Sequence, residues 1–466
     1  TERLKFTLGL RFNEDTREDY STSVLFNSLD VNTVLGGALG ETAFVRYSST
    51  QPSLFSFVAG DSGETQADLL ALYGVTADQL AAAVATPAYS PERIALATTV
   101  PAVPQAAETR ALTGSPTEFK FTEWSGRIGL DWFVTDDSMI YAFYSRGYKP
   151  GGLNPAIPVD FQSTSQFSFD PEKIDAFEIG TKNTFLNGSM VVNGAFFFYD
   201  YKGLQVTRIA NNTSLNDNID AEIWGIEGEM FWRPDALPGV GIDLAYSYTD
   251  TKVVDSVSVD PTNRTADNPD WITFNNIDSG ALTGINFIAM TDQVTDAVLA
   301  NCIGVGGVVP VPELSYPDGT PALWSRNCLA SNGVETSDGL ETDLDGNELP
   351  NTPKHNIKIG LDYTWDIPAI AGSLMVRWDY YWQSKSYARE FNTVADRIDS
   401  WDQHNASLIY QSTNGQWQGR LFVRNVLDDD NVTGHYLTSD TSGFFRNYFL
   451  TEPRIWGASV RYNFGS

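Results

Sequence analysis

The chain carries little positive charge and has no long apolar run. Its 466 residues include 30 Lys and Arg against 59 Asp and Glu, a net charge of −29. Proteins bind a phosphate backbone through Lys and Arg, so this balance excludes nucleic acid as a partner. The apolar runs are far shorter than the roughly 20 residues of a membrane-spanning helix. If the chain crosses a bilayer, it must do so as a closed sheet, because strands in lipid cannot leave backbone groups unpaired.

Residues that carry chemistry are also scarce. The three histidines, His355, His404 and His435, show no metal-ligand spacing, and no Gly-rich phosphate loop or GxSxG turn occurs. We therefore predict neither an enzyme nor a cofactor, while a catalytic group assembled in space at a barrel rim is left open. The two cysteines, Cys302 and Cys328, lie in one polar region. A disulfide between them would suit an oxidising compartment, and two free thiols are the alternative.

What the chain has in abundance is two-residue alternation. In the final stretch, Trp456, Ala458, Val460, Tyr462 and Phe464 share one side of an extended strand, and the residues between them are polar or glycine. One such strand would also suit a soluble sandwich. The same pattern recurs along the chain with many aromatic residues on the apolar side, and this repetition favours a transmembrane antiparallel β-barrel with lipid outside and a polar lumen.

We predict twelve strands with alternating short and long connections. They cover 4–12, 118–134, 138–148, 171–185, 189–206, 219–232, 242–252, 354–365, 374–383, 401–411, 416–425 and 456–464. The strand at 189–206 is apolar on both sides, so its orientation stays unassigned. Two connections, 14–117 and 251–352, are long, and the Ala-rich part of the first, 76–85, could hold a short helix. Outer-membrane barrels keep long loops outside, which places both chain ends in the periplasm.

Five segments of these strands resemble the barrel of TonB-dependent outer-membrane receptors. They are YAFYSRGYKPGGLN (141–154), PEKIDAFEIGTKNTFLNG (171–188), AEIWGIEGEMFWRP (221–234), LFVRNVLDDDN (421–431) and PRIWGASVRYNF (453–464). The resemblance spans nearly all the strand segments. It implies a barrel of about 22 strands around an N-terminal plug. It also implies a segment before the plug that engages TonB, and uptake of a scarce solute such as a siderophore, cobalamin or an oligosaccharide.

The chain departs from that plan because it shows twelve strands, no plug and no TonB-contacting segment. We interpret residues 1–466 as the C-terminal part of a receptor barrel in the outer membrane of a Gram-negative bacterium, with the front part missing or on a separate chain. A barrel that closes with twelve strands is one alternative. A structural barrel that anchors partner surface proteins, or an ungated porin, are the functional alternatives. The expected partners are lipid, lipopolysaccharide, TonB through the missing part, and the barrel assembly machinery.

Three groups of residues are candidates for specific roles. For ligand contact we select aromatic and basic residues at the outer strand ends, namely Arg146, Tyr148, Lys149, Tyr387 and Arg389. For calcium, the tract with Asp343, Asp345, Asn347 and Glu348 crowds oxygen ligands but departs from the EF-hand pattern, and a solvated acidic loop is the alternative. For recognition by the assembly machinery, the resemblance implies Gly457, Tyr462 and Phe464, which also suit lipid anchors.

The long loops hold most of the excess negative charge. Residues 14–117 contain 12 acidic and 4 basic groups, a net charge of −8, and residues 251–352 contain 15 and 3, a net charge of −12. Together they supply −20 of the total of −29. A barrel opening surrounded by this negative charge would disfavour anionic ligands within about a Debye length. Solubility, or contact with divalent cations held by lipopolysaccharide, is the alternative explanation.

Overall fold

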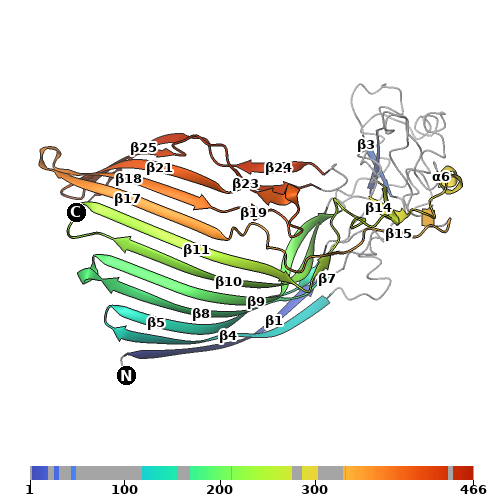
Figure 1. The fold of residues 1–466 in the computed structure, drawn as a ribbon, viewed down its shortest axis with the longest axis horizontal. Coiled ribbons are helices and arrows are strands. Elements are labelled where there is room, and N and C mark those ends of the chain that lie inside the picture. Colours follow the sequence, from blue (N-terminus) through green and yellow to red (C-terminus); the bar gives the residue numbers. More distant parts are fainter. Residues whose placement is uncertain are drawn as a thin grey trace.

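The computed structural model describes residues 3–18, 26–30, 44–48, 118–154, 168–210, 213–274, 286–302, 329–330, 332–438 and 444–464. Twelve long strands form one antiparallel sheet in which each strand pairs with the next one along the chain (Figure 1). The predicted all-β fold is therefore confirmed, and so is the number of strands in the main sheet. These strands are β1 (Leu4–Glu18), β4 (Glu118–Thr135), β5 (Ser138–Lys149), β8 (Glu172–Phe185), β9 (Met190–Ala210), β10 (Thr213–Trp232), β11 (Val240–Val254), β17 (His355–Ile367), β18 (Gly372–Gln383), β21 (Trp401–Ser412), β22 (Trp417–Arg424) and β25 (Ile455–Tyr462).

The outer face of the sheet is apolar and uncovered. Phe6, Leu8 and Leu10 of β1 are 63%, 71% and 74% exposed, and they continue across the sheet through register partners such as Ile128. At the opposite edge, Trp456 is 74% exposed. Side chains of this size need an apolar neighbour, and lipid tails provide one on the outside of a membrane barrel.

The structure also assigns the orientation of β9, which alternation alone left open. Phe196 is 43% exposed and pairs in register with the outward Ile179, whereas Phe197 is 8% exposed. Phe196 therefore faces outward and Phe197 inward. Gly225 makes room for the inward ring, because a Cβ atom at that position would lie 2.5 Å from the Phe197 ring. The two-residue pattern within one strand cannot reveal a contact between a ring and a glycine of the neighbouring strand.

Aromatic rings border the apolar band at both ends. Toward the long loops, rings touch across neighbouring strands, with centroid distances of 4.9 Å for Tyr144 and Phe177 and 5.2 Å for Trp224 and Tyr248. Toward the short turns, the distances are 4.5 Å for Tyr363 and Trp365 and 4.6 Å for Trp417 and Tyr462. Amphipathic rings prefer the two membrane–water interfaces, so the two bands mark the limits of a membrane-spanning segment.

The two ends of the sheet differ in their connections. Both chain termini lie at the end with the short turns, and the long connections lie at the other end (Figure 1). One short turn is the 3₁₀ turn Leu186–Gly188, where Asn187 and Gly188 take the positive φ angles, 55° and 95°, that the sequence predicts. This arrangement agrees with a periplasmic position of both ends.

The sheet does not close on itself. Among the described residues, β1 pairs in the main sheet only with β4, and β25 pairs only with β22. The alternative of a barrel that closes with these twelve strands is therefore wrong for this structure. Two free sheet edges cannot face hydrocarbon, because their backbone groups would lack hydrogen-bond partners. The sheet is thus open in the described residues, and its place as one section of a larger barrel stays a prediction.

Strand β1 is longer than predicted, and both long connections contain short strands that alternation did not predict. Strand β1 continues to Glu18, and β2 (Phe26–Asp30) pairs with β3 (Phe44–Ser48) in the first connection. The Ala-rich segment 76–85 lies outside the described residues. The second connection begins after Val254 and contains a three-stranded sheet of β13 (Trp271–Phe274), β14 (Phe287–Met290) and β15 (Thr336–Ser337).

The second connection has its own hydrophobic core. Buried Phe274, Phe287 and Leu329 pack together, and Val298 of helix α6 (Asp296–Cys302) packs against them. The second connection, predicted only as a long one, thus contains a small packed unit. No helix in the described ranges is both long and apolar enough to cross a membrane.

Candidate functional site

The predicted ligand contacts at the end of β5 form ion pairs with β8. Arg146 donates two hydrogen bonds to the Asp175 carboxylate, at 2.7 Å from Nε and 2.5 Å from Nη2, and the Tyr144 hydroxyl donates a third at 2.5 Å. Strand alternation puts Arg146 on the face of Tyr144, which is the outer face. Lys149 lies 3.7 Å from Glu172, and the Tyr148 hydroxyl has no hydrogen-bond partner in the described part of the chain. Tyr148 therefore keeps a buried polar atom that no described residue uses.

The other two predicted contacts lie in the connection after β18. Tyr387 belongs to the short strand β19 (Ser386–Tyr387), which pairs with β20 (Arg397–Ile398). The Arg389 side chain is only 12% exposed and binds the Asp396 carboxylate at 2.6 and 3.0 Å and Asp260 at 3.1 Å. Ligand contact by these five residues stays a prediction, and the geometry gives Arg389 a structural task.

Asp396 is the centre of a junction between three outer connections. Its side chain is fully buried, accepts from Thr393 at 2.7 Å, and lies 3.5 Å from Arg446 of β24 (Arg446–Leu450). Arg389 links it to Asp260 in the connection after β11. Burial lowers the pKa of the Arg389 guanidinium, but its bonds to Asp396 and Asp260 outweigh this and leave the pKa raised. The connections after β11, β18 and β22 are thus joined by buried charge.

His435 completes this junction. It lies in β23 (Val432–Leu437), is 6% exposed and contacts the Tyr448 ring at a tilt, with 5.4 Å between ring centroids. Neither ring nitrogen has a hydrogen-bond partner among the described residues. Burial and the nearby Arg446 lower the pKa of the imidazole, against an opposing effect of Asp396. The imidazole of His435 is therefore harder to protonate here than in an unfolded chain.

The acidic tract after β16 (Thr342–Asp343) has partners within the protein. Asp345 lies 3.4 Å from Lys252, and Glu348 lies 3.5 Å from Lys354, whose pKa is raised by its bond to Asp250. The Asn347 amide donates to the Glu390 carbonyl at 2.9 Å. Within the described ranges, no three His, Cys, Asp or Glu side chains come together in a way that could hold a metal ion. The calcium site stays a prediction.

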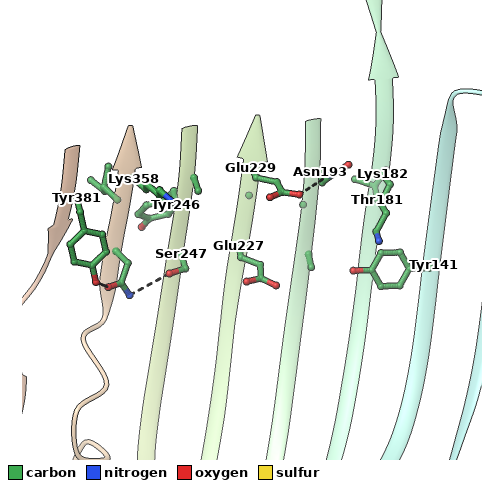
Figure 2. A pocket seen from close by; sticks show the side chains of 16 residues that line it. Tyr141, Thr181, Lys182, Asn193, Glu227, Glu229, Tyr246, Ser247, Lys358 and Tyr381 are labelled. Carbon is green, nitrogen blue, oxygen red and sulfur yellow. Dashed lines mark hydrogen bonds between the residues drawn. The ribbon is translucent and has the colours of Figure 1, made fainter. Parts of the chain in front are cut away.

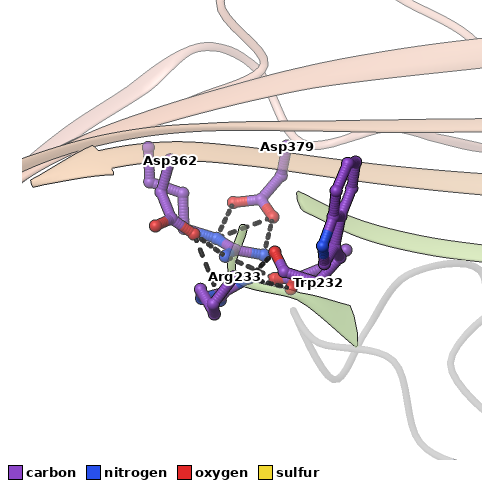
Figure 3. Close-up of polar contacts among 6 residues, drawn as sticks. Trp232, Arg233, Asp362 and Asp379 are labelled. Carbon is purple, nitrogen blue, oxygen red and sulfur yellow. Dashed lines mark hydrogen bonds and ion pairs between the residues drawn. The ribbon is translucent and has the colours of Figure 1, made fainter. Parts of the chain in front are cut away.

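A charged network lies on the inner face near the short turns (Figure 3). Arg377 of β18 binds Asp379 at 2.7 Å, Asp243 of β11 at 2.7 Å and Asp362 of β17 at 3.2 Å. Arg233, after β10, binds Asp243 at 2.9 Å and Asp362 at 3.4 Å. Two guanidinium groups thereby hold three carboxylates from three neighbouring strands, and this fastens the strands together at one level.

A groove crosses the inner face at a different level (Figure 2). It encloses about 430 Å³ and is lined by side chains from seven consecutive strands, β5 to β18. At its two ends, the Tyr141 hydroxyl donates to Glu178 at 2.7 Å and the Tyr381 hydroxyl donates to Asn356 at 3.0 Å. Asn193 donates to Glu229 at 2.8 Å between them. The groove is polar along its rim and shallow.

The predicted assembly residues lie on or after the closing strand. Tyr462 contacts the Phe464 ring edge-on at 4.6 Å, and Phe464 is 89% exposed. Gly457 faces the Phe422 ring so closely that a Cβ would lie 2.2 Å from it. Gly457 therefore has a packing role that the sequence did not suggest, and recognition by the assembly machinery stays a prediction. Cys328 lies outside the described residues, so the disulfide with Cys302 is also still a prediction.

Sequence reasoning missed the inner-face network and the groove. Their residues, including Arg377 and Glu227, were seen only as the polar side of each strand. A signal existed: Asp243, Asp362 and Asp379 are carboxylates on predicted inner faces of strands close in sequence, and buried carboxylates need cations. The strand register, which the sequence alone did not provide, places these three carboxylates at one level of the sheet.

A family model described as "TonB dependent receptor-like, beta-barrel" matches residues 1–426. The chain belongs to this family of TonB-dependent receptors. Among curated proteins it is similar to the probable TonB-dependent receptor BfrD of Bordetella pertussis, with 26% identity over 130 residues. That alignment covers 28% of this chain and 17% of BfrD. Barrels of this family lie in the outer membrane of Gram-negative bacteria, and this TonB-dependent receptor barrel is therefore an outer-membrane protein.

Solved structures give a likeness in shape with little sequence identity. The ferric yersiniabactin uptake receptor FyuA of Yersinia pestis is 17% identical, with a TM-score of 0.48, over 75% of this chain and 38% of that one. The siderophore receptor PiuA of Acinetobacter baumannii is also 17% identical, with a TM-score of 0.43, over 74% of this chain and 36% of that one. The chain thus spans well under half the length of the relatives that it matches.

Proposed function

We propose that this chain is the barrel portion of an energised importer that carries a scarce solute across the outer membrane. The observation that carries the proposal is a single wall of twelve strands with an apolar outside, a polar inside and a family match over residues 1–426. The polar inside includes a charged network and a groove, which a hydrated lumen can accommodate without desolvating them. An importer of this class needs such a lumen.

The proposal includes further strands that complete the barrel. The free edges of β1 and β25 must each pair with another strand in lipid. About ten more strands, together with a plug and a TonB-contacting segment, would complete the family plan. The intact mass of the native protein tests this: a value well above 51.3 kDa is expected, or a second chain that co-purifies with it. A native barrel of this chain alone would contradict it.

The solute class is proposed from two considerations. PiuA is named a siderophore receptor and FyuA a ferric yersiniabactin uptake receptor, and a siderophore is therefore one candidate here. Cobalamin and oligosaccharides are the others. The acidic outer connections disfavour an anionic solute, because a focused negative field lowers its local concentration. A neutral or cationic solute therefore suits this mouth best.

Growth of a deletion strain tests the importer directly. The strain should fail to grow on one limiting source among iron chelates, cobalamin and oligosaccharides, and should recover when the complete gene is returned. Disruption of TonB should abolish the recovery. Steady conductance of the native protein in a planar bilayer, with growth independent of TonB, would instead identify a porin. Stable partner chains over the outer connections, with no growth defect, would identify an anchoring barrel.

A further inference from the structure

Three neighbouring short turns each carry an exposed aliphatic side chain. Leu186 in the turn after β8 and Leu237 in the turn after β10 are each 56% exposed, and Ile370 in the turn after β17 is 44% exposed. We call these three residues the apolar rim. Turns that face water favour Gly, Pro, Asn, Asp and Ser. Aliphatic side chains at three successive turns therefore indicate contact with an apolar neighbour.

Backbone hydrogen bonds hold the three turns side by side. The Arg233 amide donates to the Ser189 carbonyl at 2.8 Å, which joins the first turn to the second. The Thr364 amide donates to the Gly239 carbonyl at 2.8 Å, which joins the second turn to β17 and so to the third. Each hairpin adds two strands with a spacing of about 4.8 Å, so the turns follow one another at about 10 Å. The apolar rim is thus one row.

The turns on either side of the apolar rim are polar. The turn between β4 and β5 exposes Asp136 and Asp137, and the turn between β21 and β22 exposes Asn414. Both belong to the same end of the sheet, because the Thr184 amide donates to the Asp137 carbonyl and the Thr413 amide donates to the third turn, each at 2.8 Å. The same end of the sheet therefore offers matched apolar and polar turns.

The apolar rim continues the outer face of the sheet. Leu186 follows directly after Phe185, which faces outward and is 42% exposed. The Tyr410 ring lies on the outer face within 2.5 Å of where a Gly372 Cβ would be, and its hydroxyl donates to the Ile370 carbonyl at 2.9 Å. This bond holds the third turn toward the outer side. A plug inside the proposed barrel would lie on the opposite, inner side.

The backbone at Leu186 supports a role for its side chain. Its φ angle is 54°, in the left-handed region where hairpin turns favour Asn, Asp and Gly. A bulky residue in this conformation costs free energy that other interactions must offset. Transfer of the leucine side chain from water to lipid supplies such an interaction.

We infer that the apolar rim inserts into the inner leaflet of the outer membrane, where it contacts the acyl chains of phospholipids next to their headgroups. Apolar side chains at this depth anchor a protein to a membrane interface. The hairpins from β8 to β18 then end within the membrane, whereas the two polar turns beside them reach the water. The inference does not depend on transport, because it needs only the outer-membrane position of the barrel.

Spin labels on single cysteines test the inference in the complete native protein, reconstituted in vesicles of phosphatidylethanolamine and phosphatidylglycerol. The labelled variants are Leu237→Cys and Ile370→Cys, with Asp136→Cys and Asn414→Cys as matched controls, all combined with Cys302→Ser and Cys328→Ser. Power saturation compares collisions of each label with oxygen, which concentrates in lipid, and with a nickel chelate, which stays in water. The ratio should be about threefold higher or more at the two rim positions, because the acyl-chain boundary excludes the chelate.

Equal ratios at the four positions would overturn the inference. Shielding of the rim labels from both reagents would also overturn it, since a protein partner would then cover the apolar rim. Heat-modified gel mobility confirms that each variant folds. If the serine background fails to fold, the unmodified protein is irradiated with a phosphatidylethanolamine that carries a diazirine near its glycerol. Crosslinks should then fall in the three apolar turns and not in the two polar ones, and equal yields would contradict the inference.

Discussion

Arg377 in β18 donates a hydrogen bond of 2.7 Å from Nη1 to Asp243 in β11, across the intervening strand β17. Gly360 of β17 leaves the path open, because a Cβ there would lie 2.4 Å from the Arg377 Nη2 atom. The Arg377→Leu change would deprive Asp243, Asp362 and Asp379 of their shared cation. We expect a loss of about 1.5–3 kcal/mol in the free energy of unfolding, the range for hydrogen bonds to charged groups.

Urea unfolding in detergent, followed by tryptophan fluorescence, measures this loss as a lower midpoint at unchanged slope. Arg420→Leu is the control, because Arg420 also lies on the inner face but contacts the Phe422 ring and forms no ion pair in the described ranges. Equal losses in the two variants would mean that the carboxylates do not depend on Arg377.

The contact between Gly457 and Phe422 allows an experiment to distinguish a packing role of Gly457 from a role in recognition by the assembly machinery. A Gly457→Ala change places a methyl group where the Phe422 ring lies, and we expect a lower yield of folded barrel on heat-modified gel mobility. The second change Phe422→Leu in the same chain should restore much of that yield, because it removes the clashing ring atoms. If Gly457 acts only as part of an assembly signal, the double variant will stay as poor as the single one.

Arg389 is expected to hold the outer connections together. In Arg389→Met, the buried Asp396 loses its main cation and the link to Asp260 disappears, which costs about 3 kcal/mol or more for a broken buried pair. Chymotrypsin should then cut faster near Phe391 and in the connection after β11. Arg397→Met is the matched control, since Arg397 is 53% exposed and pairs with Asp399, which is 76% exposed. Unchanged cleavage of both connections in Arg389→Met would contradict the structural task of this arginine.

From the burial of His435 we predict that the hairpin of β23 and β24 is less stable in acid. Burial lowers the pKa of its imidazole below the ordinary value of 6.5, so the folded hairpin binds a proton less readily than the unfolded one. Its contribution to stability is complete above pH 6.5 and falls as the pH drops below 6.5 toward the lower folded value. The groups that face the ring are Asp396, Arg389, Arg446 and Tyr448.

Amide hydrogen exchange measures this effect after correction for the intrinsic rate. Between pH 7.5 and pH 5.5, protection in β23 should fall relative to protection in β21. The His435→Leu variant should show the same relative protection at both pH values. A fall of equal size in that variant would trace the acid effect to other groups.

Alternation in the sequence was enough to predict the main sheet. Each strand keeps one apolar side, as in Leu4 to Phe12, and a period of two has no other common cause. The same signal failed at β9, where Phe196 and Phe197 are both apolar. There the difference between inside and outside depends on Gly225, a residue of the neighbouring strand.

The candidate site was harder to predict because its contacts join distant parts of the chain. Arg389 is separated from Asp260 by 129 positions, and the pair forms only when two outer connections meet. Exposed basic residues and buried ones look alike in a sequence, so Arg389 was selected for ligand contact. The small core within 251–352 was not predicted, because it is assembled from short, scattered pieces such as Phe274 and Leu329.

Three inner rings rest on glycines of adjacent strands: Tyr141 on Gly180, Phe197 on Gly225 and Phe422 on Gly457. These three rings therefore lie parallel to the sheet and do not project toward the barrel axis. The bore is therefore wider at these places than a count of its aromatic residues would suggest, and its surface is smooth on the scale of a passing molecule.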